Sequence, residues 1–203
     1  FKSAEEGGPA GLVASADHLQ RLEQLRIRTA HARTVWQSAG VVESLRAVMK
    51  LDDPAVSLSV LHATAEWLPS FQAAECAVAL ALATPLVVPS MAPAVLAPLT
   101  ALLRTAHDRA RPVNEDNSLG ATACAVTLVA AKSSLLREVR NITAQLEQLR
   151  VPRGNVQRGA SRPSTFEEQF AFGQALAQAR EAARDAWRLL DREGEAAMPA
   201  ALG

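Results

Sequence analysis

The chain has 203 residues, of which 49% are hydrophobic and 21% charged, and its 21 basic and 21 acidic side chains leave a formal net charge of zero. This composition indicates about one globular domain and excludes a disordered chain. Aromatic residues make up only 4% and there is no Tyr, so a base-stacking platform for single-stranded nucleic acid is not expected.

Every predicted element is a helix, because apolar residues recur at three- and four-residue spacing and no segment alternates with the period of a strand. The predicted helices cover about residues 15–38, 41–51, 54–67, 71–83, 94–109, 118–150 and 164–193. We expect a flexible arm at 1–14, a helical core at 15–150, a basic linker at 151–163, a C-terminal helix at 164–195 and a tail at 196–203. This order predicts an all-α fold of stacked antiparallel helices, similar to a HEAT or armadillo array, although no fixed period recurs.

Local signals give the helix ends. Ser15 or Asp17 is a candidate N-cap of the first helix, and Gly40 is a candidate C-cap at its other end. Asp53 followed by Pro54 predicts a capped helix start. The first helix carries an apolar stripe, and arginines occupy much of its remaining face. The stripe consists of Leu19, Leu22, Ile27, Ala30 and Val35. In the C-terminal helix, we expect four large side chains to dock on the core: Phe166, Phe170, Leu176 and Trp187.

Residues 76–103 contain no charged side chain and are long enough to span a bilayer. Four prolines interrupt this stretch, however, so we expect a pair of buried core helices and no membrane segment. Cys76 and Cys124 lie in apolar stretches and are expected to be buried thiols. The nearly apolar stretch 119–131 is also expected to be buried. The chain starts without Met and shows no signal peptide at residues 1–11, so we expect a piece of a longer polypeptide.

No constellation for catalysis appears. The four histidines and two cysteines lack zinc-ligand spacing, and no phosphate-binding loop or nucleophile elbow is present. The acidic pairs each open a predicted helix, where they complement the helix dipole. We therefore expect no enzyme, no metal and no cofactor.

Charge is clustered in spite of the neutral total. Residues 132–162 carry seven basic and two acidic side chains, whereas residues 164–203 carry four basic and seven acidic ones. A basic helix end followed by a basic loop is suited to a polyanion such as tubulin's acidic tails, nucleic acid or anionic lipid. An equally good alternative is that these arginines pair with the acidic last helix. Trp36 and Trp67, near predicted helix ends, fit either core positions or binding positions.

One segment resembles a known family. Residues 27–61 contain Arg33-Thr34-Val35-Trp36, then Gly40, an apolar helix, Asp52-Asp53 and a second apolar helix with Val56 and Leu61. This order resembles the C-terminal domain of the WD40-bearing regulatory subunit of katanin, the microtubule-severing complex. Weaker similarities continue at Trp67, at Cys76, in the basic stretch 133–150 and in Ser164-Thr165-Phe166.

The resemblance implies a non-catalytic helical domain that binds the N-terminal domain of the katanin ATPase subunit and helps to target it to microtubules. It implies a location in the cytoplasm on the cytoskeleton, at microtubules, spindle poles, basal bodies or ciliary axonemes. Regulator peptides are further partners that it allows, and neither nucleic acid nor a membrane is expected as a partner. The implied partner-binding residues are Val35, Trp36, Leu45, Val48, Val56 and Leu61. The implied microtubule-binding residues are Arg137, Arg140, Arg150, Arg153, Arg158 and Arg162. The alternative is a HEAT-like adaptor or a ciliary structural subunit unrelated to severing.

Overall fold

The computed structural model describes residues 9–110, 121–150 and 166–197. Within these ranges every regular element is helical, which confirms the all-α prediction; a HEAT-like stacking of the helices stays a prediction. The α-helices are α1 (Pro9–Ala39), α2 (Val41–Lys50), α3 (Pro54–Thr64), α4 (Ala73–Ala83), α5 (Ala92–Ala110), α6 (Ala121–Gln148) and α7 (Phe166–Ala197), and two short 3-10 helices are η1 (Ala65–Ser70) and η2 (Thr84–Leu86).

The chain divides into two compact units, residues 1–60 and residues 61–203, and the boundary falls inside α3. These bounds differ from the domain bounds expected from the sequence, which stay predictions. The first helix begins at Pro9, earlier than the start near residue 15 that the sequence predicted for it.

In the first unit, two sharp turns join three helices. Gly40 adopts φ 87° and ψ 177° between α1 and α2, a region of backbone space that is essentially restricted to glycine. Asp52 also has a positive φ, of 47°, between α2 and α3, which Asp tolerates better than most residues. α2 packs against α1, and the buried Ser44 hydroxyl donates to the Ala32 carbonyl at 2.7 Å.

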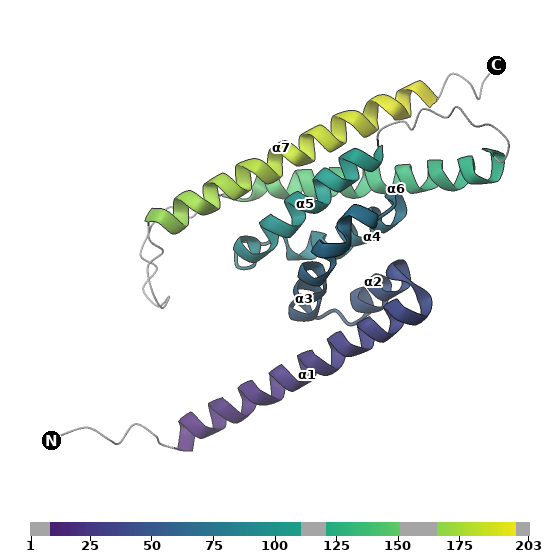
Figure 1. The fold of residues 1–203 in the computed structure, drawn as a ribbon. Coiled ribbons are helices and arrows are strands. Elements are labelled where there is room, and N and C mark those ends of the chain that lie inside the picture. The colour runs from purple at the N-terminus through teal and green to yellow at the C-terminus, as the bar shows by residue number, and fades with distance from the viewer. Residues whose placement is uncertain (1–8, 111–120, 151–165, 198–203) are drawn as a thin grey trace. The chain divides into compact units, whose positions relative to one another are not determined.

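In the second unit, α5 and α6 each pack against both α4 and α7. Figure 1 shows α7 along one side of α5 and α6, with α4 on the other side. The core is mainly leucine and alanine from these four helices, for example Leu80, Leu99, Leu102 and Leu135. α5 contains Pro98 in its interior, so the sequence was right to continue a helix through this proline.

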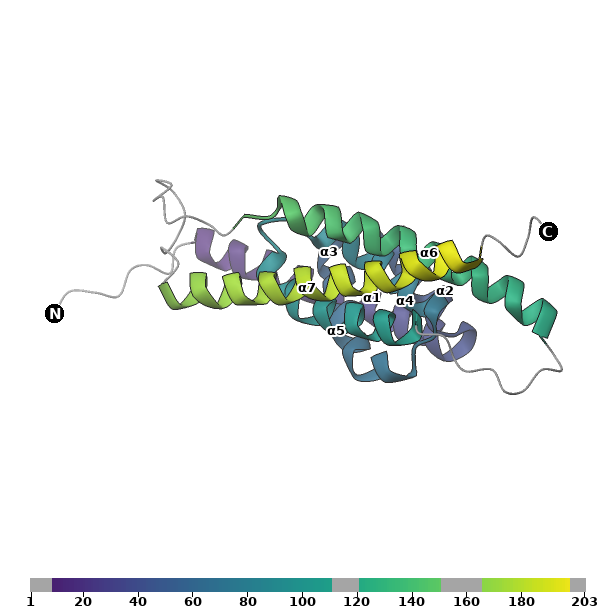
Figure 2. The same cartoon turned by 90° about the horizontal axis from the view of Figure 1, so that it is seen from above.

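α6 and α7 lie side by side and run antiparallel, as the colour gradient along the two helices in Figure 2 shows. Arg140 pairs with Asp191 at 2.6 Å and Glu147 pairs with Arg184 at 2.5 Å, so one pair lies seven residues from the other on both helices. The buried side chains repeat with steps of three and four: Leu135, Val139, Ile142 and Leu146 on α6 with Leu149 just after it, and Leu176, Ala179, Ala183, Ala186 and Leu190 on α7. This is the heptad pattern of helices that pack at a shallow angle.

Arginines also satisfy the carbonyl groups at helix ends, where no intrahelical donor is available. The Arg180 side chain of α7 donates to the carbonyls of Leu146 at 2.9 Å and Leu149 at 2.7 Å, at the end of α6. The Arg109 side chain, at the end of α5, donates to the Phe71 carbonyl at 2.8 Å and to the Pro69 carbonyl. Pro69 lies inside η1, so the third predicted helix passes into a 3-10 helix before it ends.

Several burial predictions were wrong. Val129 is 58% exposed, so the stretch 119–131 is not buried throughout; the side chains of residues 119–128 lie outside the described set. Phe170 and Trp187 are exposed on α7, whereas Leu176 is buried as predicted. The physical reason is that small alanines form most of the α7 face toward its neighbours. Large aromatic side chains are therefore not needed to fill the core there. The side chain of Phe166 is also outside the described set.

The apolar stretch 76–103 is confirmed as core: most of its side chains in α4 and α5 are buried. Among the residues that the structure describes, none of the helices has the length and hydropathy needed to cross a membrane.

Candidate functional site

Residues 27–61, which carry the motif singled out in the sequence, fold as the C-terminal part of α1, the whole of α2 and most of α3. Asp53 caps α3, because its Oδ1 accepts the backbone N–H groups of Ala55 at 3.0 Å and Val56 at 3.3 Å. The second carboxylate oxygen of Asp53 accepts a hydrogen bond from Arg28 on α1. The Asp-Asp turn therefore fixes the start of α3 against α1 within the first unit.

The predicted partner-binding residues fall into two groups. Leu45, Val48, Val56 and Leu61 are fully or almost fully buried, so they hold helices in place and offer no surface to a partner in this conformation. Val35 and Trp36 are half-buried and lie partly at the surface. Sequence reasoning could not separate these groups, since both follow the same helical spacing.

An accessible apolar surface lies on α1, at the apolar stripe that the sequence indicated. Leu19, Leu22 and Ile27 are 63%, 48% and 57% exposed. At 100° per residue they occupy one broad side of the helix, which we name the α1 apolar face. The side of α1 that is buried instead includes Ala32, which accepts the Ser44 hydrogen bond. Much of the stripe that the sequence indicated is thus exposed, because apolar periodicity identifies a face without identifying what covers it.

The predicted basic surface is described in part. Arg137, Arg140 and Arg150 are exposed, at the C-terminal half of α6 and just beyond it. Arg153, Arg158 and Arg162 lie outside the described residues. Arg137 pairs with the adjacent Glu138 at 3.0 Å and leaves 72% of its side chain exposed.

Arg140 has partners on α7. Its Nη2 donates to Asp191 at 2.6 Å, and its guanidinium lies over the Trp187 ring, 5.8 Å from the ring centroid. The exposed aromatic ring and the carboxylate thus hold the cation from two directions. This contact is the one that the alternative interpretation predicted, in which arginines of α6 pair with the acidic last helix.

In the neighbouring salt bridge the acid, Glu147, is on α6 and the base, Arg184, is on α7. The hydrogen bond from Arg184 holds the pKa of the Glu147 carboxyl below its usual value. Desolvation opposes this shift, and the positive charges of Arg184 and Arg180 add to it. Glu147 is therefore held in its charged form beside α7.

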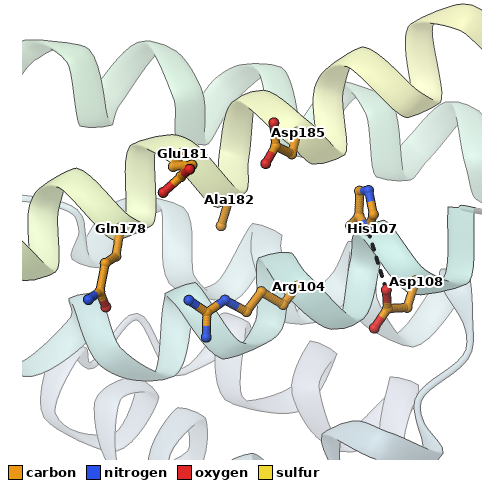
Figure 3. A pocket seen from close by; sticks show the side chains of 7 residues that line it. All are labelled: Arg104, His107, Asp108, Gln178, Glu181, Ala182 and Asp185. Carbon is orange, nitrogen blue, oxygen red and sulfur yellow. Dashed lines mark hydrogen bonds and ion pairs between the residues drawn. The ribbon is translucent and has the colours of Figure 1, made fainter.

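A polar groove of about 420 Å³ lies between α5 and α7. Figure 3 shows Arg104, His107 and Asp108 on α5 facing Gln178, Glu181, Ala182 and Asp185 on α7. The His107 ring and the Asp108 carboxylate are 3.3 Å apart. Sequence reasoning missed this groove, since its two sides are about seventy residues apart and no local motif links them.

Two observations limit the chemistry. Among the described residues, no group of three or more His, Cys, Asp or Glu side chains is arranged to hold a metal ion. The Cys76 thiol is buried as predicted, and desolvation raises its pKa to about 12, so it is a poor nucleophile at neutral pH. The side chain of Cys124 lies outside the described set.

Comparison of the chain with family models, with curated proteins and with solved structures finds no match.

Proposed function

We propose that the chain is a non-catalytic helical scaffold of a microtubule-severing complex, which binds the N-terminal domain of a katanin ATPase subunit and contributes basic side chains to microtubule binding. The observation that carries the proposal is the order of the motif from Arg33 to Leu61. It folds as three helices joined by a glycine turn and an Asp-capped turn, which is compatible with a domain that presents helices to a partner. The katanin identity rests on the sequence resemblance alone.

The α1 apolar face is the surface proposed for the ATPase subunit. Three large apolar side chains, Leu19, Leu22 and Ile27, are exposed on one helix, and covering such side chains stabilises a complex by about 25 cal/mol per Å² of apolar area. The buried Leu45, Val48 and Val56 act indirectly, by holding α2 and the start of α3 in place.

Coexpression with the N-terminal domain of the katanin ATPase subunit from the same organism tests the first half of the proposal. Light scattering after size exclusion should show a one-to-one complex. Leu22→Glu should abolish it, whereas Gln24→Glu, which adds the same charge at another exposed position of α1, should not. A chain that remains monomeric beside the ATPase domain would contradict the proposal and favour the helical adaptor of another client.

The basic surface is tested by cosedimentation with microtubules. Arg137→Glu should weaken binding several-fold and reduce its salt dependence, because Arg137 is exposed and its only described salt bridge is to its neighbour Glu138. Arg188→Glu is the matched control: its side chain is also 72% exposed, and it also pairs with a near neighbour, Asp185, on its own helix. Equal binding by the wild type and the Arg137 variant would show that Arg137 does not contribute to microtubule binding.

A further inference from the structure

Arg140 belongs to the proposed microtubule-binding surface and also contacts α7. Its guanidinium donates to Asp191 at 2.6 Å and covers the Trp187 ring. Both partners belong to α7, whereas Arg140 belongs to α6. An acidic ligand that binds Arg140 therefore competes with the Asp191 carboxylate for the guanidinium.

From this contact we propose that α7 is a built-in competitor of acidic ligands for the arginine surface of α6. The proposal rests on the proposed function for the identity of the ligand, tubulin's acidic tails, and deepens it by naming the group that regulates the same surface. Asp191 occupies Arg140 in the free protein, and an acidic peptide takes its place in the complex.

The energetic balance allows such an exchange. The Arg140 and Asp191 side chains are 52% and 46% exposed, and salt bridges at this exposure hold only weakly. α7 itself is kept in place by other contacts. Its buried face packs on α5 and α6, and Arg180 donates to carbonyls of α6. Loss of the Asp191 contact therefore frees Arg140 without detaching the helix.

The geometry also makes the competition local. The next salt bridge along the register, Glu147 with Arg184, has its acid on α6 and its base on α7. Its exchange would not release a basic side chain of α6. Among the described salt bridges between α6 and α7, Asp191 is the acid that holds an α6 arginine.

Binding of a fluorescein-labelled poly-L-glutamate peptide, measured by anisotropy at low salt, tests the competition. Asp191→Asn removes the competing charge and keeps the side-chain shape, and it should tighten binding about 2- to 5-fold, the factor that corresponds to a weak exposed salt bridge. Asp185→Asn is the control. It changes the net charge equally and lies on the same helix, but it pairs with Arg188 and not with α6. Arg140→Gln combined with Asp191→Asn should cancel the gain.

A second readout follows Arg140 directly. The indole N–H resonance of Trp187, assigned with Trp187→Phe, should shift when poly-glutamate binds the wild type, because a new carboxylate then lies beside the guanidinium that covers the ring. The shift should be absent in the Arg140→Gln variant. Equal gains in the Asp185 and Asp191 variants would reduce the effect to net charge and overturn the proposal. No gain with Asp191→Asn would overturn it as well.

Cosedimentation of the same variants with microtubules separates this inference from the proposed function. If Asp191→Asn gains affinity for poly-glutamate while no variant binds microtubules, the competition stands and the microtubule assignment fails. Suppose instead that the wild type binds microtubules, and that Asp191→Asn binds neither microtubules nor poly-glutamate more tightly than the wild type does. The microtubule assignment then stands and the competition fails.

Discussion

Arg28 on α1 donates a hydrogen bond to the carboxylate of Asp53, which lies 25 residues further along the chain at the start of α3. The other oxygen of the same carboxylate caps α3 through the N–H groups of Ala55 and Val56. One side chain thus serves as a helix cap and as a link between two helices. Asp53→Ala should lower the free energy of unfolding by about 1–2 kcal/mol, measured by urea denaturation.

The two roles of Asp53 can be separated. Asp53→Asn keeps an oxygen for the cap but removes the charge, so it should cost about 1 kcal/mol or less. In a double-mutant cycle with Arg28→Ala, the coupling energy should be about 0.2–1 kcal/mol and should decrease with salt. A coupling of zero at low salt would show that the ion pair contributes nothing to stability.

Gly40 is required for its backbone conformation and not for space. Its φ of 87° and ψ of 177° are disfavoured for any residue with a side chain, although a Cβ at this position would meet no other atom within 4 Å. Gly40→Ala should therefore destabilise the protein by about 1–3 kcal/mol through strain alone. Ala39→Gly, at the neighbouring exposed position, is a control for the ordinary cost of glycine in a helix end, about 1 kcal/mol or less. If Gly40→Ala leaves the stability unchanged, the turn can adopt another conformation.

Alanine at position 183 sets the approach of α7 to its neighbours. Ala183 is fully buried, whereas Ala177, on the same helix, is exposed. Ala183→Leu should cost roughly 1–3 kcal/mol because it overpacks the contact, and Ala177→Leu should be nearly neutral. Thermal unfolding followed by circular dichroism compares the two. Similar melting temperatures would contradict the close packing of α7.

Cys76 makes stability fall at alkaline pH. Burial raises the pKa of its thiol from an ordinary value of 9.0 to about 12, so the unfolded chain loses this proton at lower pH than the folded chain. Below pH 9 the free energy of unfolding does not depend on this thiol. As the pH rises from 9 toward 12, the free energy of unfolding falls by up to about 4 kcal/mol. In Cys76→Ala this part of the pH dependence should be missing. If the free energy of unfolding of the wild type and of Cys76→Ala changed in parallel with pH just above pH 9, the raised pKa of Cys76 would be contradicted.

Local chemistry explains which parts of this fold the sequence could predict. The Gly40 turn, the Asp53 cap and the helices around them depend on adjacent residues, because turn and cap chemistry acts over a few positions. The burial of Leu45 and Val48 follows from helical spacing. The exposed Leu19 and Leu22 show the limit of the same rule, because spacing does not reveal whether a partner element exists.

Contacts between distant residues could not be predicted in the same way. The groove between α5 and α7 combines side chains such as Arg104 and Glu181, which no local pattern relates. The pairing of Arg140 with the last helix was only one of two open alternatives, since net charge indicates attraction between segments but not the register. Asp191 becomes its partner because α6 and α7 align in heptads, and this alignment is visible only once both helices are placed.

The Arg180 side chain of α7 donates hydrogen bonds to the carbonyls of Leu146 and Leu149 at the end of α6. The last turn of α6 therefore has no complete set of hydrogen bonds of its own and acquires one only when α7 is in position. In a folding chain, Arg180 can stabilise this turn only after residues more than thirty positions downstream have docked. Deuterium uptake at the end of α6 and in the middle of α7 would then rise together, as a single cooperative opening.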